Sequence, residues 1–220
     1  MSSSLIQLLV LAGIAIFLIL RLKSVLGTRE GFEKPPLSPD QAPARRARPD
    51  LEVIEGGPDR DITDHVEDGS DSAKALAAMK MAEPGFNVSE FLGGARQAYE
   101  MILVAFERGD ISEIRGFLDA DVAEAFDAVI ADRQAQGLTI QSEIVGVRDV
   151  ELKEAEFDRT TKVAEVTVAF LAELTSAVRN AEGEIVEGDP NAIIRQRDVW
   201  TFSRTMGSDD PNWQLIATGG

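Results

Sequence analysis

The stretch VAEVTVAFLAEL, residues 163–174, alternates apolar and polar side chains. The apolar side chains at every second position share one side: Ala164, Val166, Val168, Phe170, Ala172 and Leu174. Glu165, Thr167 and Glu173 are among the residues opposite. A period of two is typical of a β-strand with one face in a core and the other toward solvent. We therefore predict a half-buried strand here, with a sheet around it.

Further strand-like segments lie on both sides of this stretch. Residues 140–152 are rich in β-branched side chains, which strands favour. Downstream we expect a brief strand at 185–186 and two more at 197–204 and 212–218, the last two joined by a loop dense in turn-forming residues. The C-terminal part of the chain therefore predicts an antiparallel sheet whose strands are joined by turns.

Upstream of residue 137 the apolar residues repeat every three to four positions, which indicates helices. We expect Ser72 to cap a short helix that Pro84-Gly85 ends, and Ser89 to cap the longest helix, which ends near Gly109. A third helix begins at Asp119. Helices followed by strands predict an α+β domain whose helices cover one face of an antiparallel sheet.

The N-terminal stretch LIQLLVLAGIAIFLIL, residues 5–20, is apolar and uncharged. Crossing a bilayer takes roughly 20 helical residues, and residues 21–26 supply the difference when Arg21 and Lys23 snorkel to the interface. We predict one transmembrane anchor at 5–26, preceded by a short tail at 1–4. The alternative is a cleaved secretory signal, which would carry its positive charge before the apolar run.

Basic residues flank the C-terminal end of the predicted anchor: Arg21, Lys23, Arg29 and Lys34. Positive charge close to a membrane span stays on the cytoplasmic side. We therefore expect a single-pass protein with its N-terminus outside and its C-terminal domain in the cytoplasm. The absence of Cys agrees with a reducing compartment.

Residues 27–71 are predicted to be a disordered linker, because they are rich in Pro and charge and bury too little apolar surface to offset the entropy of ordering. Between residues 21 and 48, seven basic residues against three acidic ones form a basic collar, which suits anionic lipid headgroups. Residues 84–220, with 25 acidic and 12 basic residues, carry a balance of −13. Because such a body repels nucleic acid, we expect no nucleic-acid partner.

Two stretches carry a family resemblance. The run ALAAMKMAEPGFNVSEFLGGARQAYEMILVAFERGD, residues 75–110, resembles the opening of the C-terminal domain of mitochondrial inner-membrane translocase subunit forty-four. The family pattern there is a short helix, D-P-x-F, and F-x-x-x-A at the head of a long helix that ends in Gly-Asp. WTFSR at 200–204, with NWQL at 212–215, resembles the last hairpin of that domain. The resemblance covers residues 74–218, and Glu83 stands where Asp commonly precedes Pro.

The resemblance implies a nuclear-transport-factor-two-like cone, in which a curved sheet wraps over helices around an apolar cavity. On this reading a short amphipathic helix at 72–83 precedes the cone domain at 84–220. The charged stem of the mitochondrial proteins is absent and an anchor replaces it, which resembles the bacterial inner-membrane relatives. The mitochondrial relative tethers a heat-shock chaperone to a protein-conducting channel, and the missing stem leaves chaperone recruitment open.

The residue inventory offers little for catalysis. His65 is the only His, Tyr99 is the only Tyr, and the sequence has no metal-ligand spacing, phosphate loop or nucleophile elbow. An isomerase-type site needs a carboxylate base and an oxyanion donor, for which Tyr99 with Glu165 or Glu173 is the best pairing. We therefore expect no enzymatic activity, no cofactor and no metal.

We predict an inner-membrane adaptor whose cytoplasmic domain binds a protein partner or lipid and assists protein transport or assembly. The candidate contact residues are apolar: Leu76, Met79, Met81, Phe86, Tyr99, Trp200, Phe202 and Trp213. The tryptophans and Phe202 have two interpretations, as cross-strand pairs in the core or as the lining of a pocket for a partner. The alternative function is a small-molecule carrier or isomerase-type enzyme that uses the cone cavity. A ribosome-associated module is disfavoured by the acidic charge.

Overall fold

A computed structural model of the chain describes residues 58–219. The predicted tail, the predicted anchor at 5–26 and most of the predicted linker lie outside these residues. Within residues 58–219, no helix is both long enough and apolar enough to span a bilayer. The predicted α+β class is confirmed for this part of the chain, which holds helices followed by strands.

The strands form one four-stranded antiparallel sheet in the order β1-β2-β3-β4. Its members are β1 (Thr139–Phe157), β2 (Val163–Arg179), β3 (Ile185–Thr205) and β4 (Gln214–Gly219). The stretch at 163–174 begins β2, at the centre of the sheet, and its six alternating apolar side chains are each at most 2% exposed. The predicted half-buried strand is therefore confirmed.

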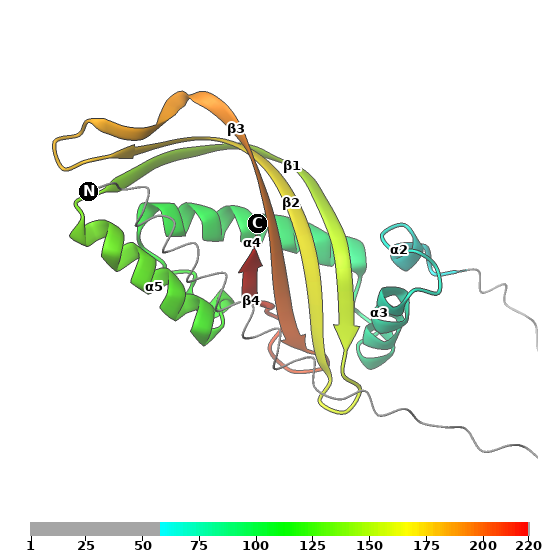
Figure 1. Cartoon of the computed structure of the whole chain (residues 1–220). Coiled ribbons are helices and arrows are strands. Elements are labelled where there is room, and N and C mark those ends of the chain that lie inside the picture. The colour runs from blue at the N-terminus through cyan, green and yellow to red at the C-terminus, as the bar shows by residue number, and fades with distance from the viewer. Residues whose placement is uncertain (1–57, 220) are drawn as a thin grey trace, which may run out of the picture. The chain divides into compact units, whose positions relative to one another are not determined.

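The sheet curves over the longest helix (Figure 1). Three shifts in the pairing of β1 with β2, at 144–146, 147–149 and 152–154, interrupt the regular ladder. Such bulges bend a strand and increase its twist. The long strands β1 and β2 can therefore arch over the helix rather than lie flat.

Strand β3 is longer than the sequence predicted, because the expected strands at 185–186 and 197–204 are parts of one element. Residues 190–193 lie between the paired residues Asp189 and Ile194 without partners of their own on β2. Pro190 is tolerated in this bulge, since it has no N–H to give to the ladder. At Gly188, whose φ is +78°, a Cβ would lie 2.2 Å from the Ser176 carbonyl oxygen, so only glycine fits.

The helices are α2 (Arg60–Thr63), α3 (Asp71–Ala82), α4 (Val88–Arg108) and α5 (Ala120–Ala135), with a 3-10 turn η1 at Arg115–Phe117. In Figure 1, α4 lies beneath the curved sheet, with α5 below it and α3 beside the far end of β1. Asp119 caps α5 as predicted, and Gly109 ends α4 with a positive φ.

Two predicted helix caps are wrong by two residues. Ser70 rather than Ser72 caps α3, because its side chain accepts from the Ala73 N–H. Asn87 rather than Ser89 caps α4, where its side-chain oxygen accepts from Glu90 N–H. The hydroxyl of Ser72 instead accepts a hydrogen bond from Ala155 N–H on β1, which ties α3 to the sheet.

Ordered structure also begins before the end of the predicted linker at residue 71. Helix α2 lies inside that range, and the Ile62 side chain on it is only 5% exposed within the hydrophobic core. One buried isoleucine and a set of hydrogen bonds described below hold α2 in place. Composition averaged over 27–71 could not reveal so short an ordered segment.

Candidate functional site

Aromatic side chains fill the space between α4 and the sheet, where the resemblance implied a cavity. The Tyr99 ring stacks on Phe170 with centroids 4.5 Å apart and 13° between the planes, and the centroid of Trp200 lies 4.7 Å from that of Tyr99. All three side chains are at most 5% exposed. For these residues the core interpretation holds, and an apolar ligand would have to displace them.

A second aromatic group closes the other end of the domain. The Phe91 ring on α4 meets Trp213 at 4.6 Å and Phe202 at 6.2 Å between centroids, and Phe86 lies 6.0 Å from Trp213. Phe86, Phe91 and Phe202 are buried, whereas Trp213 is half-buried. The residues ahead of α4 and the last hairpin therefore share one cluster.

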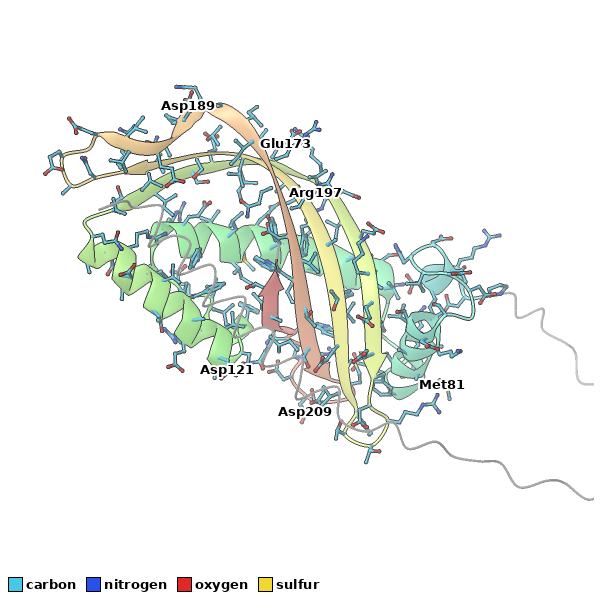
Figure 2. All side chains as sticks on the ribbon, in the orientation of Figure 1. Met81, Asp121, Glu173, Asp189, Arg197 and Asp209 are labelled. Carbon is cyan, nitrogen blue, oxygen red and sulfur yellow. The ribbon has the colours of Figure 1, made fainter. Side chains whose placement is uncertain are left out.

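The candidate contact residues divide sharply by exposure. Six of the eight are buried in the core: Leu76, Met79, Phe86, Tyr99, Trp200 and Phe202. Met81 on α3 is 84% exposed, and Figure 2 shows it at the outer end of that helix. A partner can therefore reach only Met81 and Trp213 of this set without opening the fold, and binding at either stays a prediction.

An ion pair joins the two stretches that carried the family resemblance. The Glu83 carboxylate accepts hydrogen bonds from the Arg204 guanidinium and from Gly207 N–H. The same guanidinium lies 5.4 Å from the centre of the Trp213 ring. Partial burial raises the pKa of the Glu83 carboxyl, but these two donors outweigh it and hold the pKa below its ordinary value of 4.5. The acidic residue before Pro84 thus fastens α3 to the β3–β4 hairpin.

The Tyr99 hydroxyl has a partner other than Glu165 or Glu173, the two carboxylates considered for an isomerase-type site. The Tyr99 hydroxyl donates to Asp198 Oδ2 on β3 over 2.6 Å, and the same oxygen accepts from the Gln196 amide at 2.9 Å. Glu173 lies in Figure 2 on the outer side of the sheet, where it pairs with Arg148 and Arg195. Burial and the Asp198 charge raise the pKa of the Tyr99 hydroxyl. This hydroxyl is committed to a structural partner.

His65, predicted to lie in the linker, contacts the first turn of α4. Its Nε2 lies 3.0 Å from Ser89 Oγ, a distance at which a base can activate a nucleophile. Ser89 Oγ, however, donates to Asp61, which also accepts from the N–H groups of Val88 and Ser89. Those N–H groups are the donors that an oxyanion would need. The arrangement therefore fastens α2 to α4 rather than activating Ser89.

Asp61 is the centre of this α2 contact. Burial raises the pKa of its carboxyl, but the Lys80 ammonium, 2.7 Å away, and the α4 N–H groups outweigh burial and hold that pKa well below its ordinary value of 3.8. A carboxylate at the N-terminus of a helix also interacts favourably with the helix dipole. Asp61 therefore fastens α2 to the start of α4 and to Lys80 on α3.

The exposed flank of α4 is bordered by three adjoining cavities of about 320, 570 and 440 Å³. Met101, 47% exposed, lines the first and the second. Glu100, Val104 and Arg108 line the second and the third. Because they share these walls, we treat them as one surface, the α4 groove, which extends from Phe91 to Arg108.

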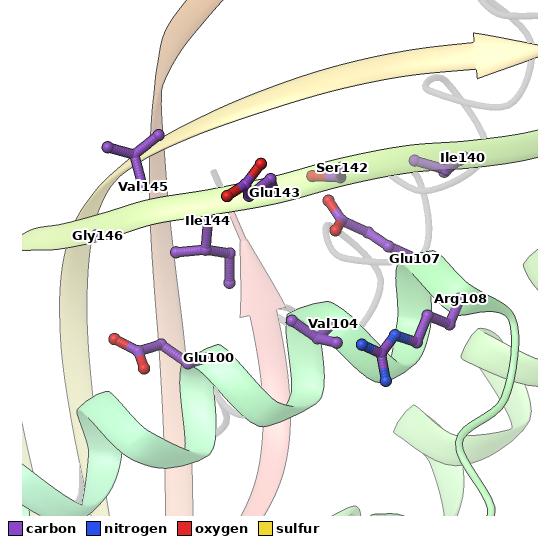
Figure 3. A pocket seen from close by; sticks show the side chains of 10 residues that line it. All are labelled: Glu100, Val104, Glu107, Arg108, Ile140, Ser142, Glu143, Ile144, Val145 and Gly146. Carbon is purple, nitrogen blue, oxygen red and sulfur yellow. The ribbon is translucent and has the colours of Figure 1, made fainter. Parts of the chain in front are cut away.

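The third cavity lies between α4 and the first half of β1 (Figure 3). Val104, Ile140 and Ile144 give it an apolar wall, and the carboxylates of Glu100, Glu107 and Glu143 border it. Burial raises the pKa of the Glu107 carboxyl, and the nearby Ser142 hydroxyl and the charge of Arg133 offset part of that rise. Sequence reasoning missed this site because its acidic residues come from two elements with unrelated periodicities.

The described residues hold no group of three or more His, Cys, Asp or Glu side chains arranged to bind a metal ion. The domain thus presents a packed interior, structural polar networks and an exposed groove.

A family model described as the Tim44-like domain matches residues 72–220. The chain belongs to this family. The Tim44 resemblance seen in the sequence is therefore confirmed.

The curated relatives are named as mitochondrial import inner membrane translocase subunits. The human TIM44 is 26% identical over 167 residues, which is 71% of this chain and 36% of the human protein. The Arabidopsis thaliana TIM44-1 is 21% identical over 152 residues, or 66% of this chain and 32% of the relative. The chain therefore spans about a third of the length of these Tim44 relatives.

Among solved structures, the intermembrane space region of the chloroplast protein ARC6 superposes with a TM-score of 0.38 and 13% identity. That superposition covers 60% of this chain and 92% of the chloroplast chain.

Proposed function

We propose that this chain is a non-catalytic, membrane-anchored adaptor that holds a protein partner at the inner membrane during protein transport or assembly. The match of the Tim44-like family to residues 72–220, which include almost all of the described domain, carries this proposal. The relatives' names place them in an inner-membrane import translocase. A tethered binding domain is the part of such a machine that this chain would supply.

The arrangement of polar side chains supports binding rather than chemistry. Within residues 58–219, the best nucleophile–base pair is Ser89 with His65, and the nearby helix N–H groups already serve Asp61. The best tyrosine–carboxylate pair is Tyr99 with Asp198, at the edge of a filled core. A carrier or isomerase using the interior would need an open cavity beside that pair, so we rank this alternative second.

The proposal places the anchor at residues 5–26, with the N-terminus outside and the C-terminal domain in the cytoplasm. Arg21, Lys23, Arg29 and Lys34 would lie at the cytoplasmic headgroups, where each basic residue contributes about 1 kcal/mol in contact with anionic lipid. The predicted linker would give the domain a reach of tens of ångströms.

Fractionation of cells that express the full chain or a variant lacking residues 1–26 tests the membrane part. The full chain should remain in the pellet after alkaline carbonate extraction, and the variant should be soluble. External protease should spare residues 58–219 until the membrane is broken. Release of the intact chain by carbonate, or digestion of the domain in intact cells, would overturn the proposed anchor or its orientation.

In-cell crosslinking tests the adaptor part. A photo-crosslinking residue at Met81 or Trp213 should join the domain to a component of a transport or assembly machine, and the same residue at the buried Leu76 should give no product. A full chain that yields no protein adduct from any exposed position would contradict an adaptor role.

A further inference from the structure

The α4 groove combines an apolar floor with an acidic border. Along its floor the side chains are small or flexible: Gly94, Ala98, Met101, Val104 and Ala105. Small residues let a second backbone approach closely, and an exposed methionine adapts to different side chains. The whole α4 groove, from Phe91 to Arg108, follows the helix for about 25 Å, the length of roughly 17 helical residues.

The border of the groove carries an excess of negative charge. Six acidic residues line the three cavities: Glu90, Glu100, Glu107, Asp110, Glu113 and Glu143. Arg108 is the one basic residue among the lining residues of these cavities. Glu107 interacts with the charge of Arg133, whereas no ion pair within residues 58–219 engages Glu100 or Glu143. These carboxylates remain free to meet cations from outside.

Charge complementarity defines what the groove can accept. An acidic border repels an anionic membrane surface and other acidic segments, and it attracts Lys and Arg side chains. The apolar floor in turn favours an occupant with aliphatic or aromatic side chains on one face. Lysine and arginine suit the third cavity especially, because their stems can lie on Val104, Ile140 and Ile144 while their charged ends reach Glu100 and Glu143.

We propose that the α4 groove binds a basic amphipathic helix of a partner protein, with its apolar face on Ala98 and Met101 and its cationic side chains toward Glu100 and Glu143. This assignment rests on the proposed adaptor function and names the chemistry of the partner segment. A helix of four turns matches the length of the α4 groove, and helix-in-groove recognition presents anchors at i, i+3, i+4 and i+7.

The test uses the full chain in neutral detergent and three fluorescent peptides of about 16 residues, the length that spans the α4 groove. One peptide places Leu and Lys on opposite faces of a helix, one carries Glu in place of Lys, and one scrambles the Leu–Lys order. Fluorescence anisotropy should show binding of the amphipathic Leu–Lys peptide, weakening as salt rises, and much weaker binding of the other two.

The variants locate the site. The double variant E100Q/E143Q should bind the basic peptide about threefold to tenfold more weakly, as expected for two partly exposed charge pairs. Ala98→Trp should abolish binding by filling the floor, and its melting temperature shows whether the fold persists. The control E182Q/E187Q removes the same charge from exposed positions of the β2–β3 turn and the start of β3. This control should bind the basic peptide like the unmodified chain. The acidic stretch at 50–71 is present in every variant, so it cannot account for a difference between them.

Equal affinity for the scrambled peptide, or full binding by E100Q/E143Q and Ala98→Trp, would overturn the groove assignment. So would stronger binding of the Glu peptide, or groove-dependent binding of vesicles that contain anionic lipid. Crosslinking in cells separates a failure of the groove assignment from a failure of the adaptor role. If Ala98→Trp still yields the same protein adducts through Met81, the adaptor stands and the groove is not its binding surface.

Discussion

The hydroxyl of Tyr99 on α4 donates a hydrogen bond to the carboxylate of Asp198 on β3 over 2.6 Å. This bond joins the centre of the longest helix to the sheet, at the edge of the aromatic cluster formed with Phe170 and Trp200. Its donor is also the chain's single tyrosine. The contact can therefore be followed spectroscopically without interference from other phenols.

Alkaline titration should show delayed ionisation of Tyr99. Burial, and then the Asp198 hydrogen bond and charge, raise its pKa above the ordinary value of 10.0. A raised pKa in the folded state gives stability that is fully present below pH 10 and is lost as the pH rises above it. Ultraviolet absorbance should show phenolate formation only together with unfolding, followed by circular dichroism. Ionisation near pH 10 in a folded protein would contradict the buried hydrogen bond.

The two tryptophans should differ in their contribution to stability. Trp200 is 5% exposed and packs on Tyr99 and Phe170, so Trp200→Ala should lower the free energy of unfolding by about 3–5 kcal/mol. Trp213 is half-buried, and Trp213→Ala should cost about 1–2 kcal/mol from its aromatic contacts. Urea denaturation of both variants measures the difference. Equal losses would mean that Trp213 is as buried as Trp200.

Glu83→Gln should destabilise the domain by about 1.5–3 kcal/mol, the range for hydrogen bonds to charged groups. The change removes the negative charge beside Arg204, whose side chain is only 9% exposed. Lys153→Met is a suitable control, because it breaks the exposed ion pair with Glu151 and should cost about 0–1 kcal/mol. Chemical denaturation of both variants tests this, and a Glu83→Gln loss as small as the control's would show that the pair is dispensable.

Asp61→Asn should weaken the domain at neutral pH and matter less in acid. Loss of the charged acceptor for the Val88 and Ser89 N–H groups should cost about 1–2 kcal/mol. Because the pKa of the Asp61 carboxyl is depressed in the folded state, its stabilisation is complete above its ordinary pKa of 3.8 and disappears as the pH falls further below it. Urea midpoints of the two proteins should therefore differ at pH 7 and converge in strong acid. The exposed Asp64→Asn change removes none of these contacts and should leave the urea midpoint at pH 7 nearly unchanged.

The features that could be predicted from the sequence are those with a regular period. Residues Ala164 to Leu174 alternate because the middle strand of the sheet has one buried face, and this pattern alone indicated the strand. Two of the predicted helix caps were displaced by two residues, because Ser72 and Ser89 are good caps by type but serve Ala155 and Asp61 instead. Residue type cannot show which of two nearby hydroxyls finds a distant partner.

The groove and the polar contacts could not be predicted, because they depend on residues that the fold brings together. Glu83 and Arg204 are 121 positions apart, and Tyr99 and Asp198 are 99 apart. Asp198 was overlooked beside Glu165 and Glu173, because all three are strand carboxylates and only the register distinguishes them. Burial within the candidate contact set could not be predicted for the same reason, since apolar character alone does not separate the buried Leu76 from the exposed Met81.

The hairpin that pairs Arg204 with Glu83 and brings Trp213 against Phe91 also sets the order in which the domain can form during synthesis. Helix α4 leaves the ribosome about a hundred residues before β4, and Leu215 on β4, fully shielded in the finished domain, arrives last. Until then the Phe91 end of α4 lacks its contact with Trp213 and is exposed to aggregation or to chaperones. A premature stop before Trp213 should therefore produce an insoluble chain rather than a slightly shortened domain.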